Sequence, residues 1–517
     1  MKLRKIISLL LAMMMACAMI PTMASADEEI NFIFGLNNTW TTLFPYNHAS
    51  SYSTQVWDAL YEPLVCIQDS VVYRNAESID ISEDFTQWTV HLNPACTWSD
   101  GVPTTAEDWV WTFQTVTNPD FGVWNDTIQM NVITGTTSAG LLEEGAELGV
   151  ELVDDYTFIL HFKSAVTLDT FACIRTSYWH AMPKHLLSDM AVSEIATSEY
   201  WLAPVGNGCC TFVEEVVTGN ELLLKARKDY YLGTPEFDYL TFKVLDSSNI
   251  ANAFLTGEID TCYSAPGAST RATLVGQNGL HADADPYCGT TQSLVINNRR
   301  FNARVRKAFD MLIDKTLLAT VIGGEGSYPV GDMYLPTMSY NLPYEHSVDV
   351  EGAIAILKEE GYDFDYTIKL GASNTSSQQN TAAIIKQNLE AAGLKVEIVT
   401  QEFSQLNAMQ RAGELDCILQ GNTVRAVATS HMDWYEISDG TYEHANDEEL
   451  YALCQETDQC TDPDRYLELV QELQLMQWER CPRIYLYFTP GYVVNSARTS
   501  NVYTGLFTLL YQIHIEK

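Results

Sequence analysis

The chain of 517 residues is strongly acidic, with 29 Lys and Arg against 67 Asp and Glu and a formal net charge of −38. This balance argues against nucleic acid as a partner and against a polybasic membrane-binding patch, because both need clustered Lys and Arg. Hydrophobic residues make up 46% of the chain and aromatic residues 11%, as in globular rather than disordered proteins. We expect two to four domains of roughly 100–200 residues, and a small molecule or a protein as the partner.

The first residues predict export from the cytoplasm. A cationic start precedes an apolar run over residues 6–20, and Ala24-Ser25-Ala26 supplies small residues for cleavage. We predict a signal peptide over residues 1–26 and a periplasmic or cell-surface location. Cys17 leaves open cleavage before a lipid-modified cysteine. The run is short for a membrane span of about 20 residues, and we expect no later span.

The first half of the chain alternates helix and strand patterns. Tyr52–Val65 predicts a helix that runs into an exposed turn at Pro63. Thr105, with Asp108 three residues later, predicts a capping box that opens a helix reaching Gln114. Period-two alternation and turn residues predict strands, which we place at Asn31–Leu36, Trp88–Leu92, Tyr156–Phe162, Asn220–Ala226 and Tyr239–Val244.

Two distant stretches share one construction. Ser248–Thr256 and Phe403–Ala412 each predict a helix that ends at a glycine, and the triplets Glu-Ile-Asp260 and Glu-Leu-Asp416 follow. A helix, a glycine cap and a short returning strand at two places predict two lobes of related construction. The remaining elements are the helices Glu351–Glu360, Asn380–Ala392 and Pro463–Trp478 and the strands Gly393–Ile398 and Arg483–Phe488.

No catalytic signature stands out. The chain has no GxSxG, HExxH, GxxxxGK[ST] or GxGxxG motif, so we predict neither an enzyme nor a cofactor. Carboxylate pairs such as Asp154-Asp155 are expected by chance among 67 acids. His431 and His444, near Asp433 and Asp447, could form a loose metal site, but their spacing is poor and we predict no metal.

The 12 cysteines leave two interpretations. Eleven remain once Cys17 is removed with the signal peptide, and an odd number leaves at least one unpaired. Cys454 and Cys460 are close enough in sequence for a local disulfide, whereas Cys209 and Cys210 are adjacent and therefore poor partners. We favour free buried thiols.

Several runs are informative because they occur together and in order. The most specific is WTVHLNPACTWSDGVPTTAEDWVWTFQTVTNP from Trp88; others are PVGNGCCTF from Pro204, FLTGEID from Phe254, VINNRRFNARVRKAFDMLIDK from Val295 and PRIYLYFTPGYVV from Pro482. This set resembles the peptide/nickel family of solute-binding proteins, which deliver ligands to ATP-binding-cassette importers. The resemblance covers nearly all of residues 30–500.

The resemblance implies an α/β, bilobal, hinged fold of the periplasmic-binding-protein type, in its large three-domain form. Domain I would combine residues 27–45, 186–270 and 485–517. Domain II would be an insertion of residues 46–185, and residues 271–484 would form domain III, the second lobe. The implied partners are a small ligand, for which we predict an oligopeptide, and the membrane permease of an importer; we expect a monomer.

The resemblance also implies a ligand site between the lobes. For the aromatic candidates Trp40, Trp124 and Phe403, packing in the core is the alternative interpretation, and for Phe403 we favour it. The residues carried over are Asn38, Thr39, Trp40, Ser51, Tyr52, Trp124, Tyr263, Ser264, Phe403, Gly421, Asn422, Thr423, Arg425 and Asp433. Gly421–Thr423 matches a loop at the end of a strand.

The chain departs from the family near this loop. Peptide-binding members usually carry an aspartate a few residues after the glycine that matches Gly421, and it pairs with the α-amino group of the peptide. Here Arg425 stands near that place and the next acid is Asp433. Either the peptide is anchored differently or the ligand is a non-peptide anion, which Arg425 would suit. An extracellular hydrolase on a two-lobed scaffold is the alternative from another class.

Overall fold

A computed structural model describes residues 29–40, 42–46, 51–67, 71–123, 130–166, 178–246, 248–263, 266–334, 341–425, 447–460, 462–502 and 508–516. The predicted signal peptide and Cys17 lie outside these ranges. In the described part of the chain, no helix combines the length and the hydrophobicity that a membrane crossing needs.

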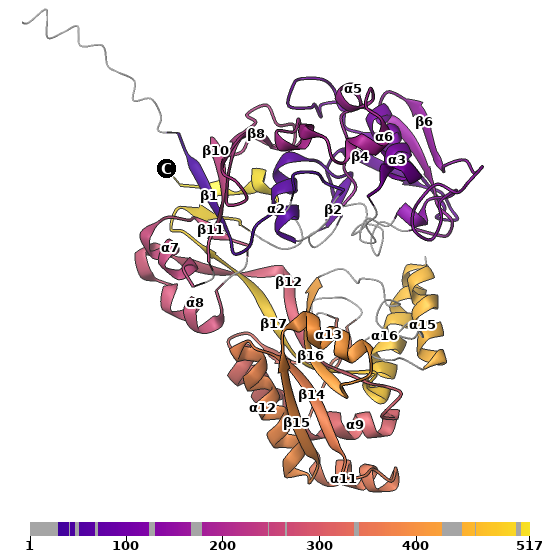
Figure 1. The fold of residues 1–517 in the computed structure, drawn as a ribbon, viewed down its shortest axis with the longest axis vertical. Helices are drawn as coiled ribbons and strands as arrows, with labels where there is room; N and C mark the ends of the chain where they lie inside the picture. The colour runs from indigo at the N-terminus through magenta and orange to yellow at the C-terminus, as the bar shows by residue number, and fades with distance from the viewer. Residues whose placement is uncertain are drawn as a thin grey trace, which may run out of the picture.

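An eleven-stranded sheet runs through both lobes (Figure 1). Its order is β15-β14-β16-β12-β17-β11-β1-β10-β9-β8, and β13 pairs with β17. The strands are β1 (Asn31–Leu36), β8 (Cys210–Val217), β9 (Glu221–Ala226), β10 (Tyr239–Val244), β11 (Thr261–Cys262), β12 (His281–Ile296), β13 (Tyr328–Pro329), β14 (Thr367–Ser373), β15 (Lys395–Gln401), β16 (Cys417–Arg425) and β17 (Arg483–Asn495).

The first lobe adds a four-stranded sheet of order β4-β5-β7-β6 and two small strand pairs. These strands are β2 (Val65–Ile67), β3 (Val71–Tyr73), β4 (Ala76–Ile81), β5 (Gln87–Leu92), β6 (Val150–Asp154), β7 (Thr157–His161), β18 (Thr499–Ser500) and β19 (His514–Ile515). The helices of this lobe are α2 (Ser51–Leu60), α3 (Ala106–Val116), α5 (Lys184–Leu187), α6 (Val192–Ile195), α7 (Ile250–Thr256) and α8 (Ala268–Leu274).

Helices flank the sheet of the second lobe (Figure 1). They are α9 (Ala303–Leu312), α10 (Lys315–Leu318), α11 (Val350–Glu359), α12 (Ser376–Ala391), α13 (Phe403–Arg411), α15 (Glu448–Gln459) and α16 (Pro463–Arg480). Short 3-10 or π turns complete the chain at Pro119–Phe121, Met130–Val132, Glu199–Leu202, Gln277–Gly279, Ala319–Gly323 and Leu510–Gln512.

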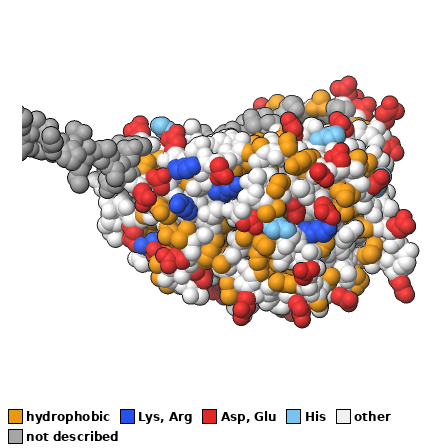
Figure 2. All heavy atoms as spheres, turned by 90° about the horizontal axis from the view of Figure 1, so that it is seen from above, with side chains coloured by type: hydrophobic (Ala, Val, Ile, Leu, Met, Phe, Trp, Pro, Cys, Tyr) orange, Lys and Arg blue, Asp and Glu red, His pale blue; other side chains and the backbone are white. Residues whose placement is uncertain are grey.

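Each lobe has its own main core. One cluster joins Phe34 of β1, Trp88 of β5 and Leu240 of β10, so the small sheet and the first-lobe part of the large sheet share one interior. A separate cluster includes Leu294 of β12 and Leu370 of β14 in the second lobe. The fold is therefore the bilobal, hinged α/β fold that the sequence predicts. Acidic side chains are spread over the face in Figure 2 rather than gathered in one patch.

Most predicted elements are confirmed, with ends that shift by a few residues. The helix predicted at Tyr52–Val65 is the main exception, because it ends at Leu60 and Val65 opens β2. Pro63 is buried and forms a bridge with His180, so the exposed turn predicted there is wrong. Pro63 disfavours helical geometry at the residue before it, which helps to end the helix here.

The two lobes are joined by the antiparallel strands β12 and β17, which cross from one lobe to the other (Figure 1). His281–Asp285 pairs with the end of β17 in the first lobe, and Gly289–Val295 pairs with its start in the second. The register is interrupted between Asp285 and Gly289. An irregularity of this kind bends a strand and weakens the local ladder, so it is a natural place for a hinge.

Two of the predicted domain boundaries fall inside elements near this crossing. The boundary after residue 270 falls inside α8, whose Leu274 packs with Ile250 and Phe254 of α7. The boundary after residue 484 falls inside β17. We propose the interruption at Asp285–Gly289 as the boundary between the lobes.

The two similar stretches of the sequence are built alike. Gly257 and Gly413 both have a φ of +72°, and the following aspartates, Asp260 and Asp416, are buried. Asp260 accepts a hydrogen bond at 2.9 Å from the backbone N–H of Ile33, on the neighbouring strand β1. Each lobe thus uses a buried carboxylate to hold two parallel strands together.

Arginines complete both aspartate sites. Arg498 pairs with Asp260 at 2.6 Å, and Arg300 pairs with Asp416 at 2.5 Å. Asp416 also accepts hydrogen bonds from the Lys369 backbone N–H of β14 and the Tyr366 hydroxyl, both at 2.7 Å. A buried carboxylate with several donors stabilises the fold only while every donor keeps its acceptor.

Replacing Asp416 should therefore destabilise the second lobe. We expect Asp416→Asn to lower its free energy of unfolding by roughly 2–4 kcal/mol, because the new amide cannot satisfy all three donors. Urea unfolding monitored by tryptophan fluorescence measures this. Asp365→Asn, which removes the exposed partner of Lys395, is the control and should leave the transition unchanged. Equal transitions for both variants would contradict the expectation.

Gly289 is required by the packing at the crossing. A Cβ atom there would lie 2.1 Å from Cζ of Phe488 and 2.8 Å from the carbonyl oxygen of Thr489. We expect Gly289→Ala to destabilise the protein by about 1–3 kcal/mol, because Phe488 or the strand must move.

A double-variant cycle isolates this clash. In a Phe488→Leu background the same Gly289→Ala change should cost less, and the difference, the coupling energy, should be at least about 0.5 kcal/mol. Denaturant unfolding of the four proteins measures it. Additive effects would show that Phe488 does not set the requirement for glycine.

Candidate functional site

The strand directions bring two sets of predicted site residues to the boundary between the lobes. β17 runs from the second lobe to the first, β11 is antiparallel to it, and β1 is parallel to β11. The carboxyl ends of β1 and β11 therefore point toward the second lobe. β16 is antiparallel to β12, so its carboxyl end points toward the first lobe. Open α/β sheets bind ligands beyond the carboxyl ends of their strands.

The segment after β1 supplies Asn38, Thr39 and Trp40. Asn38 is exposed, and its side-chain oxygen accepts a hydrogen bond at 2.9 Å from the backbone N–H of Thr39. The Thr39 hydroxyl donates to the carbonyl of Gly219 in the turn between β8 and β9, which anchors the segment. Trp40 is only 5% exposed and belongs to the core of the first lobe. Trp40 therefore packs in the core, which was the alternative interpretation of the sequence. Its contact with a ligand stays a prediction.

Two predicted tyrosines lie together. Tyr52 of α2 and Tyr263, which follows β11, form an edge-to-face pair with ring centroids 5.5 Å apart. The backbone N–H of Tyr263 donates to the carbonyl of Gly35 in β1 at 3.0 Å, which fixes where the chain leaves the sheet. Both side chains are half-buried, so they can offer a ring face and a hydroxyl to a ligand. Ser51 is the first residue of α2.

The second lobe places Gly421, Asn422, Thr423 and Arg425 within β16. The prediction of a loop at the end of the strand is therefore wrong: β16 continues to Arg425 because the long strand β12 pairs with it as far as Cys288. The side-chain amide of Asn422 donates to the Ser293 hydroxyl at 3.3 Å. These residues form the carboxyl-end half of the strand, directed at the first lobe.

Phe403 differs from the favoured interpretation. It is the first residue of α13, immediately beyond the carboxyl end of β15, and it is 39% exposed. Core packing is therefore wrong, and the contact of Phe403 with a ligand stays a prediction. Trp124, Ser264 and Asp433 lie outside the described residues.

Metal binding and disulfide pairing have separate outcomes. His431 and His444 lie outside the described residues, and within those residues no group of three or more His, Cys, Asp or Glu side chains could hold a metal ion. The alternative of a Cys454–Cys460 disulfide is wrong, because Cys460 is a free thiol whose sulfur donates to the carbonyl of Asp462 at 3.4 Å.

A contact between the lobes was missed from the sequence. The Arg271 guanidinium of α8 lies 3.8 Å from the ring centroid of Tyr492 in β17, a cation–π arrangement. The Tyr492 hydroxyl reaches the carbonyl of Glu325 in the second lobe at 3.4 Å. Burial lowers the pKa of Arg271. No spacing in the sequence signals this contact, because its three residues come from segments far apart in the chain.

Comparison with known proteins places the chain in a family. The family model described as bacterial extracellular solute-binding proteins, family 5 Middle, matches residues 70–440. The chain is 25% identical over 412 residues to the periplasmic oligopeptide-binding protein OppA of Haemophilus influenzae, covering 72% of each chain. It is 26% identical over 476 residues to di/tripeptide-binding protein 4 of Pseudomonas aeruginosa, covering 83% of this chain and 85% of that one.

Solved structures agree on the fold. The ABC transporter substrate-binding protein CtaP of Listeria monocytogenes superposes with a TM-score of 0.81 at 20% identity, over 94% of this chain and 99% of that one. The oligopeptide-binding protein AppA of Bacillus subtilis, solved with a nonapeptide, superposes with a TM-score of 0.72 at 16% identity, over 95% of this chain and 100% of that one. Together with the match to the family model, this shows that the chain belongs to the bacterial extracellular solute-binding proteins of family 5.

Proposed function

We propose that this protein captures an oligopeptide between its two lobes and delivers it to the permease of an ATP-binding-cassette importer. The observation that carries the proposal is the family match over residues 70–440. The fold supports it, because the carboxyl ends of β1 and β11 in one lobe and of β16 in the other point toward the boundary between the lobes. Relatives whose names specify oligopeptides or di- and tripeptides support peptide as the ligand class.

The chemistry of the candidate site suits a peptide. Asn38, Tyr52, Tyr263 and Asn422 offer hydrogen-bonding groups and ring faces, and Phe403 offers an apolar surface. Such groups satisfy a peptide backbone and pack against its side chains without depending on one side-chain identity. Closure of the lobes would bury the ligand and create the form that a permease recognises.

We propose that the protein acts outside the cytoplasm as a monomer, with a cleaved signal peptide and, if Cys17 is modified, a lipid anchor. We also propose that it releases its ligand unchanged. A hydrolase and a carrier of non-peptide anions are outcomes that the experiments below distinguish.

Binding without turnover is the first expected outcome. Mass spectrometry of small molecules that co-purify with the natively folded protein should identify intact peptides. Added back at about 100 times its dissociation constant, such a peptide should stabilise the protein by roughly 2.7 kcal/mol, measured as a rise in melting temperature. Cleaved peptides after incubation would favour the hydrolase, and a peptide library that leaves the melting temperature unchanged would reject peptide cargo.

Arg425 tests how the ligand is anchored. If its guanidinium pairs with the carboxylate of the peptide, Arg425→Ala should weaken binding about tenfold or more, which corresponds to 1.4 kcal/mol per decade. Arg425→Asp should weaken it further. Isothermal titration measures both.

The matched control for this experiment is the same peptide with an amidated C-terminus. It lacks the carboxylate, so its affinity should not depend on residue 425. Equal affinities of all three proteins for the free-acid peptide would show that Arg425 is not the anchor.

A further inference from the structure

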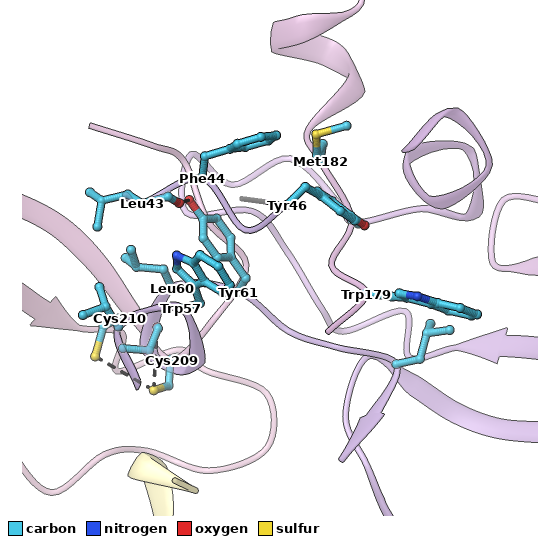
Figure 3. Packing of buried hydrophobic residues seen from close by; sticks show 14 of the residues in the cluster. Leu43, Phe44, Tyr46, Trp57, Leu60, Tyr61, Trp179, Met182, Cys209 and Cys210 are labelled. Carbon is cyan, nitrogen blue, oxygen red and sulfur yellow. Dashed lines mark hydrogen bonds between the residues drawn. The ribbon is translucent and has the colours of Figure 1, made fainter. Parts of the chain in front are cut away.

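Cys209 and Cys210 are adjacent cysteines whose sulfur atoms lie on the same side of the chain (Figure 3). The two Sγ atoms are 3.9 Å apart and share a hydrogen bond. Both residues are buried, at 1% and 0% exposure, against the end of α2, where the Cys209 sulfur lies 4.0 Å from the carbonyl oxygen of Ala59.

This arrangement differs from what adjacency predicts. Successive side chains of an extended chain point to opposite faces, which is why the sequence makes these cysteines poor partners. Here Gly208 brings the backbone against α2: its N–H donates to the carbonyl of Leu60 at 2.8 Å, and a Cβ on it would lie 2.6 Å from the Ala59 oxygen. The chain turns at this contact, before β8 begins at Cys210.

We propose that Cys209 and Cys210 form a redox-sensitive dithiol that closes to a disulfide between adjacent residues. The oxidant is a small-molecule disulfide of the kind present outside the cytoplasm. One thiolate attacks this disulfide, forms a mixed disulfide and releases a first thiol. The thiolate of the second cysteine then attacks the Sγ atom of the first cysteine in the mixed disulfide, and the reagent leaves as a second thiol. Two electrons and two protons pass to the reagent, and one S–S bond forms in the protein.

Burial determines when the exchange occurs. It raises the pKa of the Cys210 thiol well above its usual value, and the thiolate is the reactive form. Both thiols are also out of reach of a reagent in the folded protein, so oxidation proceeds during folding, before the pair is buried.

The disulfide acts as a switch rather than as a structural cross-link. A loop between adjacent residues is minimal, so closing it removes little chain entropy, and a strained ring is reduced easily. The carbonyl of Cys209 accepts from the N–H of Arg227 at 2.8 Å, and the Arg227 guanidinium donates to the Thr97 carbonyl at 2.7 Å. Closing the disulfide ring turns the peptide bond between the two cysteines. This moves the Cys209 carbonyl and disturbs its hydrogen bond with Arg227, and with it the contact of Arg227 with Thr97.

The test is refolding in buffers of oxidised or reduced glutathione. The protein is then alkylated with N-ethylmaleimide under denaturing conditions, digested, and analysed by mass spectrometry. In the oxidising buffer the peptide that contains both cysteines should be mainly unalkylated, and its mass should be lower by two hydrogen atoms than that of the same peptide with two free thiols. In the reducing buffer it should carry two alkyl groups.

Two outcomes would overturn the proposal. One is alkylation of both cysteines in the oxidising buffer while Cys460 is found oxidised, since the latter shows that the buffer reacts with this protein. The other is linkage of Cys209 or Cys210 to a different cysteine. Cys460→Ser is the matched control and should leave the result unchanged.

The melting temperature tests whether the disulfide disturbs the contacts of Arg227 with Cys209 and Thr97. The oxidised wild-type protein should melt at a lower temperature than the reduced protein, and Cys209→Ser should abolish the difference. Cys209→Ala replaces it if the serine variant does not fold. Equal melting temperatures for fully oxidised and fully reduced wild-type protein would reject the switch.

Discussion

The antiparallel pairing of β12 with β17 is the constraint on which the rest of the molecule depends. Buried backbone N–H and C=O groups must be paired, and these two strands satisfy them in both lobes with one ladder. The ladder ties the lobes together, and we propose that they bend at the larger of its two register shifts, between Asp285 and Gly289. Gly289 also lets the strand lie against Phe488. The residue that permits this close packing therefore lies at one end of the proposed hinge.

The same ladder sets the direction of every neighbouring strand. Because β11 and β16 both run antiparallel to their crossing partners, their carboxyl ends face each other across the boundary between the lobes. The buried carboxylates of Asp260 and Asp416 then fix the strands beside them, each with an arginine partner. A binding site between lobes thus follows from sheet topology, before any side chain that contacts a ligand is considered.

In the first lobe, one helix connects the two cysteines with a candidate ligand residue. Its core is continuous from β1 to the small sheet, and α2 has the Cys209–Cys210 segment at one end and Tyr52 at the other. A rearrangement at the cysteines therefore acts on a helix that also carries a candidate ligand residue. The Arg271–Tyr492 contact lies next to the interruption of the ladder, where Tyr492 pairs with Ala284, and the Tyr492 hydroxyl reaches Glu325 of the second lobe.

The sequence by itself determined the family, the two-lobed fold and the paired helix-glycine-aspartate stretches, because these depend on local patterns: a glycine cap, alternating burial, and motifs in order. It also predicted Tyr52 and Tyr263 as residues of one site; the structure shows that their rings are in contact, and their contact with a ligand stays a prediction. Only the tertiary structure decided that Trp40 packs in the core, that Phe403 is exposed, and that Gly421 lies within a strand. Each of these depends on a partner distant in the chain, since β12 extends β16 and the first-lobe core encloses Trp40. The closeness of the Cys209 and Cys210 sulfurs has the same cause, because it results from the packing of Gly208 on α2.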